Sequence, residues 1–122
     1  MLNQVVMVGR LTRDPEVKES EDGKKYSNIT LAVQRGYKNA DGVYDTDFVD
    51  CILWNGVASN TAEYCHKGDV IGVKGRIQVS NYEKDGENRK RTEVVAEKLS
   101  FLSSSKEKND GLEEDNSNDM EM

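Results

Sequence analysis

The chain contains few of the residues from which most catalytic and metal sites are built. Its 122 residues include one histidine, two cysteines, one proline and one tryptophan. His66 lies directly beside Cys65, which leaves too few well-spaced soft ligands for four-coordinate zinc. There is also no glycine-rich phosphate loop before a helix, no Ser/His/Asp arrangement and no paired-carboxylate signature. We therefore expect no enzyme activity and no cofactor.

Three acidic residues in the middle of the chain are the one candidate for a metal-dependent nuclease site. Asp45, Asp47 and Asp50 lie in or beside a predicted strand. Because alternate side chains of a strand point to opposite faces, Asp45 and Asp47 share one face while Asp50 points away. This division indicates that the three carboxylates do not bind one metal ion.

Long apolar runs are also missing. No segment approaches the ~18 consecutive apolar residues of a membrane span, and the N-terminus lacks the charged and apolar regions of a secretory signal. We expect a soluble, cytoplasmic protein with no membrane partner. In that compartment Cys51 and Cys65 are expected to be reduced thiols of the core and not a disulfide.

Charge is divided unevenly along the chain. Residues 1–102 carry 15 basic and 16 acidic side chains, whereas residues 103–122 carry 2 basic and 7 acidic ones. Most of the formal net charge of -6 therefore belongs to the C-terminal segment. We predict one domain over residues 1–102 and a disordered acidic tail over residues 103–122. A nearly neutral domain of this kind can still carry a basic stripe.

The periodicity of apolar residues predicts five strands and one short helix. Period-two alternation indicates strands over residues 26–34, 46–55 and 70–82, apolar residues on both faces indicate a central strand over residues 2–11, and a fifth strand is expected over 89–102. Helical spacing predicts a helix over 57–66 with Asn55 as its cap. Long hairpin loops with Asp-Gly turn signals join the second strand to the third and the fourth to the fifth. This pattern predicts an all-β oligonucleotide/oligosaccharide-binding (OB) fold, a five-stranded barrel with one helix, because a sandwich would need about seven strands.

Alternation also predicts which side chains form the core. In the third strand the inward row is Val49, Cys51 and Leu53. In the fourth strand we expect four inward residues, Ile71, Val73, Ile77 and Val79, with a bulge near Gly72 or Gly75.

The outward row of the third strand is unusual, because Phe48 and Trp54 share a face with Asp50. Single-stranded nucleic acid needs exposed aromatic rings on which bases stack, together with cations along its phosphates. Both are predicted on one face of the barrel and on its hairpin loops. The candidate nucleic-acid-binding residues are Tyr37, Phe48, Trp54, Tyr82, Arg35, Lys38, Lys74, Arg76, Arg89, Lys90 and Arg91.

Other interpretations of these residues stay open at this point. Phe48 and Trp54 are also suited to packing under the helix or against another subunit, and Lys74 and Arg76 are also typical of a solvated barrel face. The tyrosines Tyr26 and Tyr44 fit either role, and Tyr64 on the predicted helix is expected to pack. Two rival functions follow: an RNA-binding barrel of the cold-shock type, and an acidic protein-interaction module or DNA mimic.

Four segments together resemble the bacterial and phage single-stranded DNA-binding proteins. They are NQVVMVGRLTRDPEV, SNITLAV, TDFVDCILWNGVA and AEYCHKGDVIGVKGRI. The resemblance implies an OB fold that coats single-stranded DNA in replication, recombination and repair, that associates with the nucleoid and that forms homotetramers. It also implies base stacking at Tyr37, Phe48, Trp54 and Tyr82.

The end of the chain differs from the family pattern. Family tails commonly end in Pro-Phe and dock replication and repair proteins, whereas this chain ends in NDMEM and lacks both residues. An acidic and apolar tip remains, and the resemblance makes it the candidate partner-docking segment: Asp119, Met120, Glu121 and Met122.

Overall fold

The computed structural model describes residues 1–104 of the chain. Its elements are β1 (Val5–Leu11), β2 (Lys18–Glu19), β3 (Lys25–Lys38), β4 (Tyr44–Trp54), α1 (Asn55–Tyr64), β5 (Val70–Lys84) and β6 (Glu87–Ser103). The tail was predicted to begin at residue 103, but β6 continues to Ser103; residues 105–122 of the predicted tail, with Asp119, Met120, Glu121 and Met122, lie outside the described residues. Within residues 1–104, no helix has the length and apolar character needed to cross a membrane.

The long strands form a closed barrel, as the alternation predicted. They are hydrogen-bonded in the order β1-β5-β6-β4-β3-β2, and an additional pairing of β1 with β3 closes the sheet. All pairings are antiparallel except that of β4 with β6, which is parallel at Cys51 and Val94. The barrel is therefore the predicted five-stranded fold with the two-residue strand β2 added at one edge.

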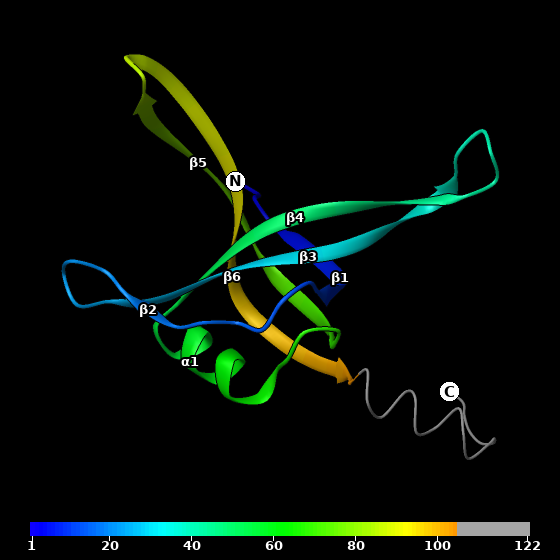
Figure 1. Cartoon of the computed structure of the whole chain (residues 1–122), viewed down its shortest axis with the longest axis horizontal. Coiled ribbons are helices and arrows are strands. Elements are labelled where there is room, and N and C mark those ends of the chain that lie inside the picture. Colours follow the sequence, from blue (N-terminus) through cyan, green and yellow to red (C-terminus); the bar gives the residue numbers. More distant parts are fainter. Residues whose placement is uncertain (105–122) are drawn as a thin grey trace.

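The core consists of the inward rows of the barrel strands. Buried side chains include Ile29 and Leu31 of β3, and Cys51 and Leu53 of β4. Helix α1 contacts β3, β4 and β6 and covers one end of the barrel with Ala58 (Figure 1). Burial raises the pKa of the Cys51 thiol to about 12, so this side chain stays protonated as part of the core.

Two hairpins extend beyond the barrel in different directions (Figure 1). We call residues 34–46 the β3–β4 arm and residues 77–93 the β5–β6 arm. Both are longer than the predicted strands, because backbone pairing continues to Lys38 opposite Tyr44 and to Lys84 opposite Glu87. The predicted Asp-Gly turns lie at their tips, with positive φ at Gly42 (77°) and at Gly86 (78°).

The arms explain one wrong prediction about the core. Ile77 and Val79 keep the expected alternation but are 45% and 53% exposed. They lie where β5 has left the barrel, so in residues 1–104 no second layer covers them. The prediction of Ile71 and Val73 as core residues is confirmed, since both are buried.

The predicted bulge occurs at Gly75, but the extra residue is on the partner strand. Lys74 pairs with Lys98 and Gly75 pairs with Ala96, which leaves Glu97 unpaired on β6. The alternation of β5 therefore continues unchanged through the bulge. A Cβ atom on Gly75 would lie 2.0 Å from the backbone oxygen of Val95, so only glycine fits.

The helix begins and ends slightly earlier than expected. Trp54, and not Asn55, is the N-cap residue, and it makes no side-chain capping hydrogen bond. Asn55 is the first helical residue and has a positive φ of 52°, which asparagine tolerates better than most residues. Cys65 lies just beyond the helix and is buried in the core.

Candidate nucleic-acid interface

The outer face of β4 presents the two aromatic residues that the sequence predicted. Phe48 and Trp54 lie at opposite ends of the outward row and are 68% and 36% exposed. They are six positions apart, which corresponds to about 20 Å along the strand. Asp50 lies between them and opposite Thr30, whose hydroxyl donates a hydrogen bond of 3.0 Å to the Asp50 carboxylate. The acid in the aromatic row is thus held by a cross-strand partner.

Trp54 is supported from one side by Tyr26 of β3. The two residues pair across the ladder, and their ring centroids are 5.7 Å apart with an interplanar angle of 45°. Tyr26, which the sequence left open, therefore packs beside the tryptophan. Such a neighbour fixes the indole without covering it, and a part of the ring remains exposed for a ligand.

The β5–β6 arm brings Tyr82 together with two of the three basic residues that were predicted on this hairpin. Tyr82 pairs with Arg89, and Ser80 pairs with Arg91. Because directly opposite residues share a face and neighbours alternate, Tyr82, Arg89 and Arg91 project on one side of the arm. Lys90 pairs with Asn81 and projects on the other side.

Arg91 also links this arm to the barrel. It lines a polar pocket of about 330 Å³ with Asn28 of β3, with Lys18 of β2, and with Arg13, Asp14 and Glu16 of the connection between β1 and β2. Arg13 donates a hydrogen bond of 3.2 Å to the Asn28 carbonyl. The two basic residues Arg13 and Lys18 were missed by the sequence reasoning. The sequence could have indicated them by their position between the first two predicted strands, because this connection contributes to ligand binding in OB folds.

Lys74 and Arg76 lie on the outward row of β5 in different surroundings. Lys74 pairs directly with Lys98, and both are exposed. Two like charges in this position repel each other, and a bound anion would reduce this repulsion. Arg76 contacts Glu97 at 3.6 Å and donates a hydrogen bond of 3.0 Å to the Gln78 side chain. Lys98 is a further basic candidate that the sequence did not indicate.

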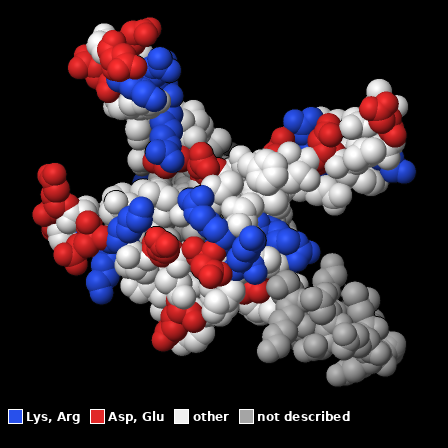
Figure 2. Space-filling model, viewed as in Figure 1, with Lys and Arg blue, Asp and Glu red and all other residues white. Residues whose placement is uncertain are grey.

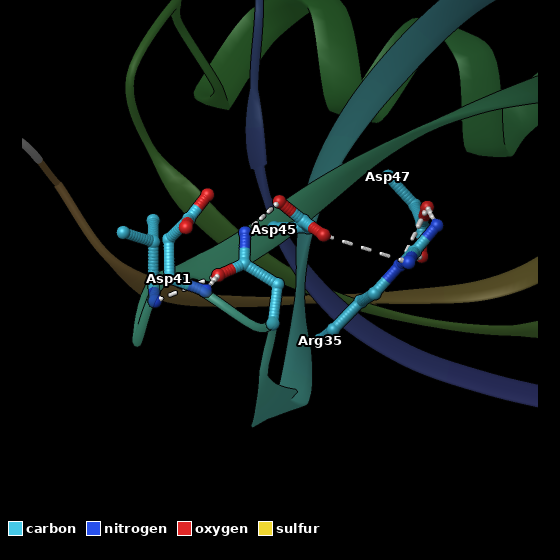
Figure 3. Close-up of polar contacts among 6 residues, drawn as sticks. Arg35, Asp41, Asp45 and Asp47 are labelled. Atoms are coloured by element: carbon cyan, nitrogen blue, oxygen red, sulfur yellow. Dashed lines mark hydrogen bonds and ion pairs between the residues drawn. The ribbon is translucent and has the colours of Figure 1, made fainter.

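The β3–β4 arm carries the remaining candidates. Lys38 lies over the ring of Tyr44, with its ammonium 5.7 Å from the ring centroid. Tyr37 is 66% exposed. Arg35 is held by the Asp47 carboxylate, to which its guanidinium donates three hydrogen bonds of 2.9 to 3.2 Å (Figure 3). The Asp47 carboxylate raises the pKa of Arg35, and the Arg35 guanidinium lowers the pKa of Asp47. Both groups therefore stay ionised at neutral pH.

The acidic residues of this region do not gather into a metal site. Asp45 and Asp47 both face Arg35, whereas Asp50 lies on the opposite face and contacts Thr30. No group of three or more metal-ligating side chains occurs among residues 1–104. Basic side chains instead follow the β5–β6 arm below its acidic tip and cross the middle of the molecule (Figure 2).

The structure also bears on the packing alternative for the aromatic residues. Helix α1 covers the end of the barrel, and no element within residues 1–104 covers Phe48. Tyr64, which was expected to pack, is exposed and lines an apolar cavity of about 360 Å³ with Leu99 and Phe101. The outer face of β4 is thus available to a ligand.

Comparison with known proteins agrees with this geometry. The sequence model of the single-strand binding protein family matches residues 2–102. The chain belongs to this family. It is 48% identical over 103 residues to single-stranded DNA-binding protein B of Bacillus subtilis, covering 84% of this chain and 91% of the relative.

Two further relatives of the family are longer. The chain is 46% identical over 105 residues to single-stranded DNA-binding protein 3 of Listeria innocua (85% of this chain, 66% of the relative). It is 45% identical over 107 residues to single-stranded DNA-binding protein 1 of Lactococcus lactis (87% and 71%). The chain therefore spans nearly all of the Bacillus protein and about two thirds of the Listeria protein.

Proposed function

We propose that this protein binds single-stranded DNA with little sequence preference and protects it during replication, recombination and repair. The observation that carries the proposal is the outer face of β4, where Phe48 and Trp54 are exposed at opposite ends of one row. The names of its relatives in the family support the same ligand. The protein acts by binding and not as an enzyme.

In this proposal bases stack on four aromatic rings, and basic side chains contact the phosphates between them. Stacking is worth roughly 1 to 3 kcal/mol per base and tolerates every base, which accounts for low sequence preference. The stacking residues are Tyr37, Phe48, Trp54 and Tyr82. The phosphate contacts are Lys38, Lys74, Arg76, Arg89 and Arg91, with Arg13, Lys18 and Lys98 added from the structure. Lys90, on the far side of the arm, contributes less.

We also propose that the protein is a homo-oligomer, with the homotetramer implied by the resemblance. Val6 and Val8 of β1 are exposed on its outward face, and Ile77 and Val79 are exposed on the β5–β6 arm. The edge of β1 pairs with β3 only at Arg10 and Leu11. Exposed apolar side chains beside an open strand edge favour association with another chain.

The binding domain is residues 1–102, and the acidic tail is residues 103–122. We propose that the tail contacts replication and repair proteins through Asp119, Met120, Glu121 and Met122. The site of action is the cytoplasm, on DNA of the nucleoid.

The test compares the affinity of the protein for three nucleic acids. Fluorescence anisotropy with labelled oligo-dT, oligo-U and a DNA duplex at several salt concentrations measures the affinity for each. We expect the tightest binding to oligo-dT, with affinity falling as salt rises because binding releases counterions. Tighter binding to oligo-U would favour an RNA-binding barrel, and absence of binding to all three would overturn the proposal.

A further inference from the structure

A network of charged side chains lies on the β3–β4 arm (Figure 3). Arg35 donates hydrogen bonds from Nε and Nη2 to Asp47, and its Nη1 lies 3.7 Å from Asp45. Asp47 neighbours Phe48 in β4, so its side chain projects from the opposite face of the strand. The guanidinium therefore does not share the face of the aromatic row.

The same network continues to the turn at the tip of the arm. The Asn39 side-chain amide donates a hydrogen bond of 3.1 Å to Asp45. The Asn39 side-chain oxygen accepts hydrogen bonds from the backbone amides of Asp41 and Val43 at 2.9 and 3.0 Å. One chain of contacts thus connects the turn, both strands and Arg35.

Arg35 occupies the irregular part of the β3–β4 ladder. Pairing is regular up to Gln34 opposite Thr46 and resumes only at Lys38 opposite Tyr44. Three residues of β3 therefore face one residue of β4, and the ladder does not fix their direction. Tyr37 is one of these three residues and lies two positions after Arg35 in the same irregular segment.

The charge balance of the network does not favour a phosphate contact. Two carboxylates surround the single guanidinium, so the local net charge is negative. A phosphate would have to displace Asp47 from a bidentate pair, which is a strong and directional arrangement. The sequence grouped Arg35 with the phosphate contacts, but its surroundings indicate another role.

We propose that Arg35 is a positioning residue, which holds the irregular segment of β3 against Asp45 and Asp47 and thereby sets the position of Tyr37 for stacking. The inference rests on the proposed function, in which Tyr37 stacks on a base. The pair is largely exposed, with side-chain exposures of 40% for Arg35 and 49% for Asp47. Exposed pairs contribute little to folding, so variants are expected to remain folded.

The test is a double-mutant cycle on oligo-dT affinity. We expect Tyr37→Ala to weaken binding by at least fivefold, the lower limit of one lost stack. Arg35→Ala is expected to weaken binding about 3- to 10-fold in the wild type and by less than twofold in the Tyr37→Ala background. Equal losses in both backgrounds would overturn the proposal, as would no loss in the wild type.

Charge variants separate positioning from direct contact. Arg35→Lys keeps the charge but cannot form the two-pronged pair, so we expect it to bind as weakly as Arg35→Ala. Asp47→Asn is expected to weaken binding, whereas Asp41→Asn, which removes the same charge at the turn, is not. If Arg35 contacts phosphate, Arg35→Lys retains affinity, Asp47→Asn binds more tightly, and Arg35→Ala lowers the salt slope by about 0.7.

One further comparison distinguishes this inference from the function on which it rests. Phe48→Ala and Trp54→Ala are measured with the same oligonucleotide. If both weaken binding while Tyr37→Ala does not, the positioning role is overturned and the proposed function stands. If none of the three weakens binding, the proposed stacking function fails as well.

Discussion

Replacement of Phe48 by alanine separates binding from folding. The side chain is 68% exposed, so about a third of its surface is buried. A fully buried phenylalanine removes about 200 Å² from water, and a third of this at about 25 cal/mol/Å² corresponds to about 1.7 kcal/mol. This value is an upper estimate of the loss in the free energy of unfolding. The variant is therefore expected to fold.

The loss in binding is expected to be larger. A stacked base contributes roughly 1 to 3 kcal/mol, which corresponds to an increase in Kd of about 5- to 140-fold. Anisotropy of a labelled oligo-dT measures this change, and thermal unfolding followed by circular dichroism shows that the variant is folded.

The chain provides a matched control, because its other phenylalanine lies elsewhere. Phe101 of β6 is 45% exposed and lines the cavity beside α1. We expect Phe101→Ala to bind oligo-dT within twofold of the wild type. Unchanged affinity of a folded Phe48→Ala variant, or an equal loss in both variants, would refute the stacking assignment.

Three further predictions concern the arm, the bulge and the core. Arg91→Ala should lower the slope of log affinity against log salt by about 0.7 per bound subunit, whereas Lys90→Ala, on the opposite side of the arm, should leave it nearly unchanged; equal slopes would contradict the assignment. Gly75→Ala should lower Tm by about 5 to 20 °C, because its Cβ would meet a β6 carbonyl, while Gly56→Ala, with open space around it, should not. The Cys51 thiol, whose pKa burial raises from about 9 to about 12, should resist a thiol reagent at pH 8 until denaturant is added. Because the folded state favours the protonated thiol, its contribution to stability should be complete below pH 9 and should disappear as the pH approaches 12, which urea titrations at several pH values can follow.

Alternation predicted the barrel well because its strands have two different faces. Ile29 and Leu31 on β3 and Cys51 and Leu53 on β4 are all buried, as the period-two pattern indicates. The same pattern placed Phe48 and Trp54 outward. Where one face of a strand is buried and the other is exposed, alternation alone predicts which side chains point inward.

The arms could not be predicted in the same way. Beyond the barrel both faces of a hairpin meet solvent, so alternation of apolar and polar residues no longer marks the inner face. Ile77 and Val79 were therefore placed in the core, although they are exposed. The lengths of β3 and β5 were underestimated for the same reason.

Side-chain partners across the arms also depend on register. The shared face of Tyr82, Arg89 and Arg91 follows from the pairing of Tyr82 with Arg89 and of Ser80 with Arg91, which composition does not reveal. The contact of Arg35 with Asp47 crosses an irregular ladder and cannot be derived from spacing alone. A basic residue in a loop can therefore be assigned as a phosphate contact only once it is known whether a carboxylate of the protein already binds it.

The most direct test of the account uses the single tryptophan. Titration of the protein with oligo-dT and with a DNA duplex, followed by Trp54 fluorescence at low and high salt, reports on the outer face of β4. The account predicts strong quenching by the single strand alone, weakened by salt. No quenching by oligo-dT with the protein shown to be folded, or equal quenching by the duplex, would contradict stacking on this face.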